Sequence, residues 1–293
     1  MAAETMRPVL LSAYTMTSCL GRGLDATRAA IHGARSGLIP CRFETVDLET
    51  FVGEIAGVDG ERVPAAMARF DCRNNRAAEL GLAQDGFIAA VDGAVRRHGP
   101  ARIGVFMGTS TAGILQTELA YRRRDPADGS LPPDFDYRRT HNTFSIAEYV
   151  RERLGLLGPC AAISTACSSS AKAFASAARL MDAGVIDAAV VGGVDTLCLT
   201  TLYGFNSLQL LSASPCRPYD TDRDGISIGE AAAFFLLERG GADTPREGFA
   251  LVGIGESCDA YHMSAPHPEG RGARMAMEAA LASAGLDAAS IDT

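Results

Sequence analysis

The chain has 293 residues, 47% of them hydrophobic and 21% charged, and a formal net charge of −8. This is the composition of a globular protein with a large core or two packed halves, and the acidic balance excludes a basic surface for nucleic acid. No apolar run approaches the roughly 18–20 residues that cross a bilayer, and the first residues lack the pattern of a secretory signal. We therefore expect a cytoplasmic protein that binds neither membranes nor nucleic acid.

The eight cysteines are scattered along the chain and form no Cys-x-x-Cys pair. Their spacing excludes a zinc ribbon and a dithiol redox motif. A reducing cytoplasm is the expected environment, and most of these thiols are expected to be small core residues.

Segments typical of strands and helices alternate along the sequence. Wholly apolar strands between helices predict an α/β fold with a sheet that is covered on both faces. In chain order, we expect a strand at Pro8–Tyr14, helices at Asp25–Ser36 and Phe87–His98, a strand at Arg102–Met107, a turn at Gly108–Gly113, an exposed loop at Tyr121–Tyr137, a helix at Phe144–Leu154, a strand at Ala161–Thr165, a helix at Ser168–Ala183, strands at Ala188–Val194, Ala231–Leu237 and Ala250–Gly255, and a helix at Gly272–Ala284.

The first and the last of these segments follow the same order of strand, loop, helix and glycine. The similarity suggests the start of a structural repeat, and the roughly 45 residues after Phe249 have room for one strand and one helix. We therefore expect a complete N-terminal half at residues 1–246 and only the beginning of a C-terminal half at residues 247–293.

Residues 163–174 read ISTACSSSAKAF and place Cys167 where a strand meets a helix. At such a junction the first N–H groups of the helix and its dipole favour a thiolate over a thiol. The same N–H groups can receive a developing oxyanion. The residues alone leave two interpretations open, a nucleophile and a buried structural cysteine.

Three other motifs resemble ligand sites, but each lacks residues or spacing that the standard site requires. The loop Gly108–Gly113 lacks the residues of a phosphate-binding loop, so it is either a plain turn or a turn that brings small side chains to a pocket. The acidic run in Cys216–Ala231 lacks the glutamate that ends a calcium loop, and Arg217 and Arg223 favour a structural Arg–Asp network. The spacing in Cys258–His267 fits no standard zinc site. We expect no bound metal, and the absence of a G-x-S-x-G motif argues against a serine hydrolase.

A set of motifs in a fixed order resembles one family, the β-ketoacyl-acyl-carrier-protein synthases, which are condensing enzymes of the thiolase-like superfamily. The similarity is to the KAS II type and runs from about residue 8 to 293. The motifs are Gly158-Pro159, Thr165-Ala-Cys-Ser-Ser-Ser170, Gly192-Gly193, Cys216-Arg-Pro-Tyr-Asp220, Arg223-Asp-Gly225, Gly229-Glu-Ala231 and Ser257-Cys-Asp-Ala-Tyr-His-Met263.

The resemblance implies a fold of five layers, αβαβα, built from two similar halves. It also implies a homodimer, or a heterodimer with a related chain. The implied reaction is a decarboxylative Claisen condensation, in which an acyl primer is held as a thioester on Cys167 and is attacked by the carbanion from malonyl-acyl carrier protein. The backbone N–H of Cys167 would form half of the oxyanion hole.

The resemblance also assigns residues to the acyl pocket and to the surface that meets the carrier protein. Thr111, Ala166 and Phe205 match pocket positions, and replacing Thr111 with Phe is expected to shorten the longest primer accepted. The chain needs no cofactor of its own, because 4′-phosphopantetheine arrives on the carrier. The residues expected to face the acidic carrier are Arg69, Arg73, Arg76, Arg138 and Arg139.

Two departures from the family pattern bear on the function. The short stretch Ser212–Cys216 looks like the form found in synthases of polyene or aryl-polyene pathways. The two catalytic histidines, the catalytic lysine and the glycine-rich gating loop of the family are missing from residues 1–293. We therefore expect a synthase truncated within its second half, which is acylated at Cys167 and does not condense on its own. The alternatives are a non-catalytic partner subunit resembling a chain-length factor, which usually lacks the cysteine, and a thiolase that acts on coenzyme A esters.

Overall fold

The computed structural model describes residues 5–240, 248–262 and 265–292, so the expected boundary between residues 246 and 247, Met263 and Thr293 lie outside the described residues. Its centre is a mixed sheet of seven strands in the order β10-β1-β9-β7-β5-β6, with β2 paired to β1. β5 runs parallel to β6 and β7, whereas β9 is antiparallel to both of its neighbours. The strands are β1 (Val9–Ser18), β2 (Gly21–Arg22), β5 (Ile103–Gly108), β6 (Cys160–Ile163), β7 (Ala188–Asp195), β9 (Ala231–Arg239) and β10 (Phe249–Leu251).

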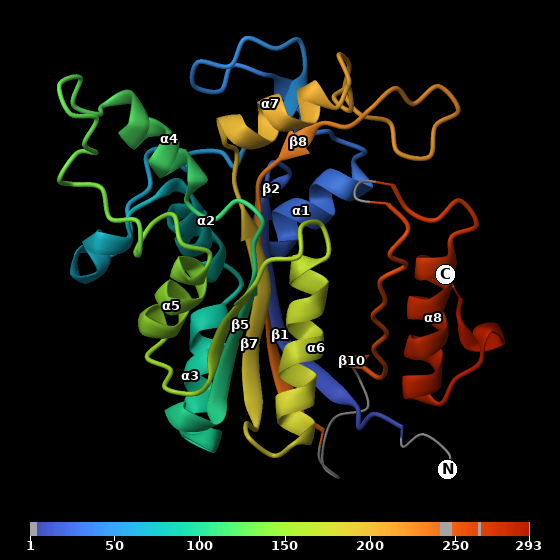
Figure 1. The fold of residues 1–293 in the computed structure, drawn as a ribbon. Helices are drawn as coiled ribbons and strands as arrows, with labels where there is room; N and C mark the ends of the chain where they lie inside the picture. Colours follow the sequence, from blue (N-terminus) through green and yellow to red (C-terminus); the bar gives the residue numbers. More distant parts are fainter. Residues whose placement is uncertain (1–4, 241–247, 263–264, 293) are drawn as a thin grey trace.

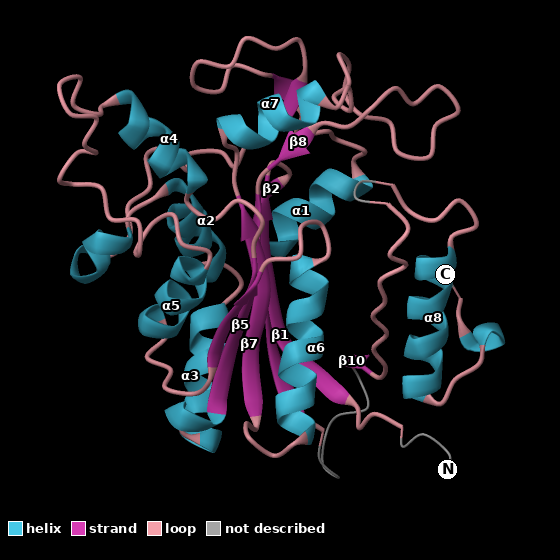
Figure 2. Cartoon of the chain, in the orientation of Figure 1, coloured by secondary structure: helices cyan, strands magenta, loops and turns pink. Residues whose placement is uncertain are grey.

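Helices cover both faces of this sheet, as expected from its apolar strands (Figure 1). Helices α2, α3 and α5 pack on one face of the sheet and α6 packs on the other (Figure 2). In this view α8 lies to the right of α6. The helices are α1 (Gly23–His32), α2 (Arg73–Leu82), α3 (Phe87–His98), α4 (Ile114–Arg122), α5 (Phe144–Arg153), α6 (Ser169–Asp182), α7 (Leu199–Ser207) and α8 (Arg271–Ala284), and the short 3-10 helices are η1 (Ala65–Phe70), η2 (Pro100–Arg102) and η3 (Ala288–Ser290). In the described part of the chain, none of these helices is long and apolar enough to cross a membrane.

Successive side chains of β7 point to opposite faces of the sheet, and each face has its own hydrophobic core. Ala188 and Val190 belong to the core beneath α2, α3 and α5. Ala189 and Val191 belong to the core beneath α6. A strand with one face in solvent alternates apolar and polar residues. Because both faces of this sheet are covered, neither face of β7 points to solvent, and its sequence from Ala188 to Val194 is therefore wholly apolar.

A third hydrophobic cluster lies above the main sheet, where α4 and α7 meet a small sheet (Figure 1). The small sheet has the order β3 (Ile39–Pro40), β4 (Phe51–Gly53) and β8 (Ile228–Gly229). The buried members of the cluster come from segments far apart in the sequence and are Phe43, Val52, Leu115, Leu197, Cys198 and Leu202. This cluster fixes α7 above the end of β7.

The expected elements are confirmed with small shifts, and four differences are informative. The helix expected at Phe87–His98 has those bounds as α3, whereas α2, α4 and α7 were not predicted. The strand expected at Ala250–Gly255 is shorter, and as β10 it pairs with β1 at the edge of the seven-stranded sheet. Beyond β10, Gly253 and Gly255 lie against the backbone of α8, where a Cβ on either residue would overlap a carbonyl oxygen of that helix.

The N-terminus of α6 lies directly on the ends of β5 and β7. A Cβ at Gly108 would overlap the backbone N of Ser170, and a Cβ at Gly193 would lie 2.8 Å from the Ser170 Cβ. Gly108 and Gly193 are themselves paired across β5 and β7. Two adjacent glycines therefore provide the space in which the first turn of α6 contacts the sheet.

Replacing Gly108 with alanine is expected to lower the free energy of unfolding by about 2 kcal/mol or more, because backbone cannot move aside as a flexible side chain can. Urea denaturation measures this change. Gly204, in α7, is the matched control, since a Cβ there meets nothing within 4 Å and alanine is the better helix former by up to about 1 kcal/mol. A Gly108→Ala protein as stable as Gly204→Ala would contradict the close contact.

Candidate active site

Cys167 lies in a short turn between β6 and α6, and its side chain is exposed. The residue before it, Ala166, has a φ of 53°. This left-handed conformation is unfavourable for alanine and persists only where its surroundings hold it. The turn places Cys167 immediately before Ser168, the N-cap residue of α6.

Hydroxyl groups of the following serines hold this turn. The buried Ser169 Oγ accepts a hydrogen bond from the Thr165 N–H (2.9 Å) and donates one to the Ala166 carbonyl (2.6 Å). The Ser168 Oγ donates to the Thr165 carbonyl at 3.0 Å. These bonds satisfy the polar groups of a turn that strand and helix leave unpaired, so the serines around Cys167 have a structural role.

Cys167 lies next to the N-terminal end of α6. The first N–H groups of an α-helix have no partner within the helix, and the dipole gives that end a partial positive charge. In the described residues, N-cap Ser168 makes no side-chain capping bond. One turn further on, Lys172 adds a cation, although its ammonium pairs with Glu256 at 2.7 Å. The thiolate is the nucleophilic form of cysteine.

The loop Gly108–Gly113 lies beside the Cys167 turn and is held by one carboxylate oxygen. Asp195 Oδ1, at the end of β7, accepts hydrogen bonds from the Thr109 Oγ1 (3.0 Å), the Ser110 N–H (2.7 Å), the Thr111 N–H (2.8 Å) and the Thr111 Oγ1 (2.9 Å). We call these four residues the Asp195 cluster. The Ser110 Oγ then donates to the Ala166 carbonyl at 2.9 Å, so the cluster contacts the Cys167 turn directly.

Sequence reasoning did not identify Asp195. The signal that marks it is a single carboxylate at the end of an otherwise apolar strand, AAVVGGVD.

The structure brings two of the three predicted pocket residues together. The Ala166 carbonyl accepts a hydrogen bond from Ser110, and Thr111 donates one to Asp195, which also binds Ser110. Phe205 lies half-buried on α7, a separate element. The Thr111 side chain is 7% exposed, and its hydroxyl donates to Asp195 and accepts the Thr196 N–H at 3.0 Å. A Thr111→Phe change would therefore disrupt the Asp195 cluster as well as the shape of any pocket.

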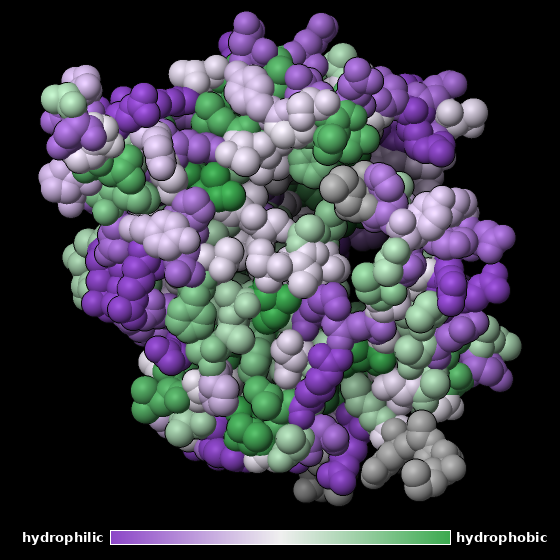
Figure 3. Space-filling model, in the orientation of Figure 1, coloured by the Kyte–Doolittle hydropathy of each residue, from purple (hydrophilic) through white to green (hydrophobic). Residues whose placement is uncertain are grey.

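Two clefts begin at the first turn of α6. One of about 260 Å³ separates α6 from the segment before α8 and is lined by Ser168, Lys172 and Glu256, among others. In Figure 3 the surface is hollowed between these elements. The second, of about 400 Å³, is lined by Ser170, Asp195 and the apolar residues Phe174, Ala231, Ala233 and Phe235. Both clefts thus reach the first turn of α6, the helix that begins directly after the Cys167 turn.

The five predicted docking arginines are not equivalent. Arg69 and Arg138 have half or more of their side chains exposed, at 50% and 70%. Arg139 is 15% exposed and pairs with Glu148 at 2.9 Å. Arg76 is 19% exposed and pairs with Asp71 at 2.6 Å. On the side of the molecule that carries α4 and α5, hydrophilic residues gather with some hydrophobic residues among them (Figure 3).

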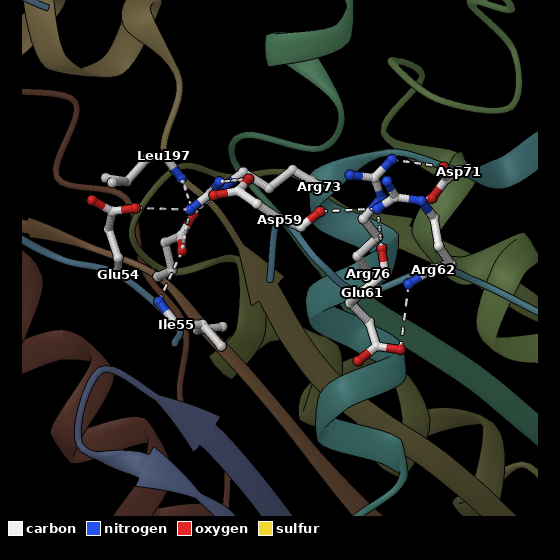
Figure 4. Close-up of polar contacts among 10 residues, drawn as sticks. Glu54, Ile55, Asp59, Glu61, Arg62, Asp71, Arg73, Arg76 and Leu197 are labelled. Carbon is white, nitrogen blue, oxygen red and sulfur yellow. Dashed lines mark hydrogen bonds and ion pairs between the residues drawn. The ribbon is translucent and has the colours of Figure 1, made fainter. Parts of the chain in front are cut away.

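The structure contradicts the docking role predicted for Arg73. Its side chain is 6% exposed and its Nε lies 2.5 Å from the fully buried Glu230 carboxylate. Asp59 and Glu54 complete a carboxylate shell around its guanidinium (Figure 4). The family resemblance assigned Arg73 to the surface that meets the carrier protein. In the structure its side chain instead points inward to Glu230, which lies far away in the sequence. A buried charge requires partners of this kind.

Glu230 also serves the backbone. Its oxygens accept the Leu197 N–H at 2.9 Å and the Ile55 N–H at 3.0 Å, so one carboxylate joins the loop after β7 to the segment after β4. In the acidic run Cys216–Ala231, Arg223 donates to the carbonyl of Asp220 at 2.9 Å and Arg217 to the carbonyl of Asp222. The arginines there hold main-chain oxygens, where we had expected carboxylates.

Comparison with known proteins comes from family models and from individual relatives. The model of the β-ketoacyl synthase N-terminal domain matches residues 6–242, and that of the C-terminal domain matches residues 249–293. The chain is 31% identical to 3-oxoacyl-[acyl-carrier-protein] synthase 2 of Vibrio cholerae, over 96% of this chain and 70% of that protein. It is 33% identical to the Rhizobium meliloti protein of the same name, over 74% of this chain and 52% of that one.

Two solved structures have the same fold. The structure of the ketosynthase ApeO in complex with its chain length factor ApeC, from Xenorhabdus doucetiae, matches with a TM-score of 0.84 and 35% identity, over 97% of this chain and 70% of that chain. A β-ketoacyl synthase from Burkholderia phymatum matches with a TM-score of 0.80 and 26% identity, over 98% of this chain and 72% of that chain. The thiolase-like fold predicted from the sequence is therefore confirmed.

The Glu230→Gln variant is expected to lower the free energy of unfolding by about 3 kcal/mol or more, because removing one charge of a buried pair leaves the other uncompensated. Urea denaturation would show the loss. Asp25→Asn is the control, since Asp25 and its partner Arg28 are both exposed and such surface pairs contribute little. Equal effects of the two substitutions would contradict the importance of the buried pair.

Iodoacetamide at neutral pH is expected to label Cys167 first among the eight thiols, followed by Cys258, which is also exposed. Cys72 and Cys160 should react last, because burial raises the pKa of each thiol to about 11 and only the thiolate is alkylated. Mass spectrometry of peptides after short exposures gives the order. If Cys167 reacted no faster than Cys258, the N-terminus of α6 would not activate it.

Proposed function

Because this chain belongs to the β-ketoacyl synthase family, we propose that it accepts an acyl group on Cys167 from acyl carrier protein, the first half of a decarboxylative Claisen condensation. The Cys167 thiolate attacks the carbonyl carbon of the acyl thioester, and the phosphopantetheine thiolate leaves as the tetrahedral intermediate collapses. The acyl group is then held as a thioester on the chain. In the complete reaction, malonyl-carrier protein loses CO₂ and its carbanion attacks that thioester.

One observation supports this proposal above the others: the cysteine is exposed at a strained turn at the start of α6. A structural cysteine would be buried, and it would need neither the left-handed Ala166 nor the partial positive charge of a helix end. In this proposal, N–H groups at the start of α6 also stabilise the oxyanion of the tetrahedral intermediate. Electrostatic stabilisation of this kind is usually the largest contribution to catalysis.

The carrier protein is the proposed source of the acyl group, and its phosphopantetheine arm is part of the substrate. Arg69 and Arg138 are at least half exposed, and although they pair with Glu152 and Glu148, we propose that they also meet acidic residues of a carrier. Arg76 and Arg139 are mostly buried and pair with Asp71 and Glu148. Their proposed role is to stabilise this surface, without direct contact with the carrier. All eight cysteines are free, which fits action in a reducing cytoplasm.

A second chain of the same family is the proposed partner in a dimer. The ApeO structure contains a ketosynthase together with its chain length factor, at 35% identity to this chain. A similar pair would require one chain that carries the nucleophile. Because this chain has Cys167, we propose that it is the chain with that role. The alternative is that this chain is the non-catalytic subunit, in which case its exposed cysteine would take up no acyl group.

Incubation with an acyl-carrier protein is expected to add the mass of one acyl group to the peptide that contains Cys167, and Cys167→Ala should abolish the addition. Intact-protein and peptide mass spectrometry measure it. Acyl-coenzyme A serves as the comparison donor, and a preference for it would favour the thiolase alternative. Absence of acylation with both donors, in a protein whose Cys167 is readily alkylated, would favour the non-catalytic subunit.

A further inference from the structure

The peptide unit between Ala166 and Cys167 links the nucleophile to the Asp195 cluster. A trans peptide is planar, so the direction of the Ala166 carbonyl sets the opposite direction of the Cys167 N–H. The Ala166 oxygen accepts hydrogen bonds from the Ser169 N–H (3.1 Å), the Ser169 Oγ (2.6 Å) and the Ser110 Oγ (2.9 Å). Whatever holds this oxygen also aims the N–H of the nucleophilic residue.

Ser110 differs from Ser169 in the element that carries it. Ser169 begins α6 and moves with the helix, whereas Ser110 belongs to the loop after β5 and is anchored to β7 through Asp195. Its N–H donates to Asp195 Oδ1 at 2.7 Å while its hydroxyl donates to Ala166. Ser110 therefore fixes the peptide unit relative to the sheet.

The loop itself is strained and needs the carboxylate. Ala112 has a φ of 43°, and its N–H is bonded to the Thr109 Oγ1 at 2.9 Å, which in turn donates to Asp195. Four donors in this loop converge on one Asp195 oxygen. The arrangement holds Ser110 in one place despite its exposure to solvent.

We infer that Asp195, acting through Ser110, is a positioning residue that directs the Cys167 N–H toward the oxyanion formed during acyl transfer. The inference rests on the proposed function, because it needs Cys167 to attack a thioester. Donors on the Ala166 oxygen also polarise the peptide unit and make the Cys167 N–H a stronger donor. The effect concerns the tetrahedral intermediate and not the reactivity of the sulfur alone.

Two reactions of the same sulfur separate positioning from a merely structural role. Acylation by the octanoyl thioester of N-acetylcysteamine passes through an oxyanion, whereas alkylation by iodoacetamide is a direct displacement without one. Ser110→Ala is expected to lower the single-turnover rate constant for acylation on the order of tenfold, less than the roughly 100- to 1000-fold lost when an oxyanion donor is removed. The thioester concentration that gives half the maximal acylation rate, and the alkylation rate, should stay within about twofold of wild type.

Further variants complete the test. Asp195→Asn keeps an acceptor for the Ser110 N–H and should lose less activity than Asp195→Ala. Ser176→Ala is the matched control, since its hydroxyl also donates to a backbone carbonyl, that of Lys172, at 3.1 Å within α6; it should change neither reaction.

Acylation that is unchanged in Ser110→Ala, or that falls in parallel with alkylation, would overturn the positioning role alone. A wild-type chain that is alkylated at Cys167 but never acylated would overturn the proposed function and the positioning role with it.

Discussion

The contact between the first turn of α6 and two glycines of the sheet is the constraint on which the rest of the site depends. Gly108 and Gly193 lie side by side on β5 and β7, and any side chain there would push Ser170 away. With the helix seated against the strand ends, the turn that precedes it is short and must include a left-handed residue, Ala166. The exposure of Cys167 follows from that turn.

Hydrogen bonds and one step along the backbone, from Thr196 to Leu197, join the Cys167 turn to the buried Arg73–Glu230 ion pair. Glu230, neutralised by Arg73, accepts the N–H of Leu197. The neighbouring Thr196 N–H donates to Thr111, which donates to Asp195. The ion pair thus fixes the end of β7, and the end of β7 fixes the loop beside the Cys167 turn. A charge pair too deep to meet any partner protein still bears on the geometry of the site.

Much of the fold is predictable because apolar periodicity is a local property. α3 and α5 follow from their apolar faces, and the apolar strands follow from a sheet covered on both faces. α7 was missed because its N-terminal N–H groups are capped by Glu118, 81 positions earlier in the chain, and no local pattern shows such a cap. The junction at Cys167 is local and was found, whereas Asp195 and the inward turn of Arg73 depend on partners far away in the sequence.

The two ends of α6 differ in the size of their side chains. Toward its C-terminal end, Leu180 and Met181 pack into the core beneath the helix. Toward its N-terminal end the helix presents Ser169, Ser170 and Ala171, and both clefts at the site open there. Burial of large apolar side chains holds a helix in place, and small residues leave room for a ligand beside it. The helix is therefore anchored at the end away from Cys167, so the end next to Cys167 is free to carry small and polar residues.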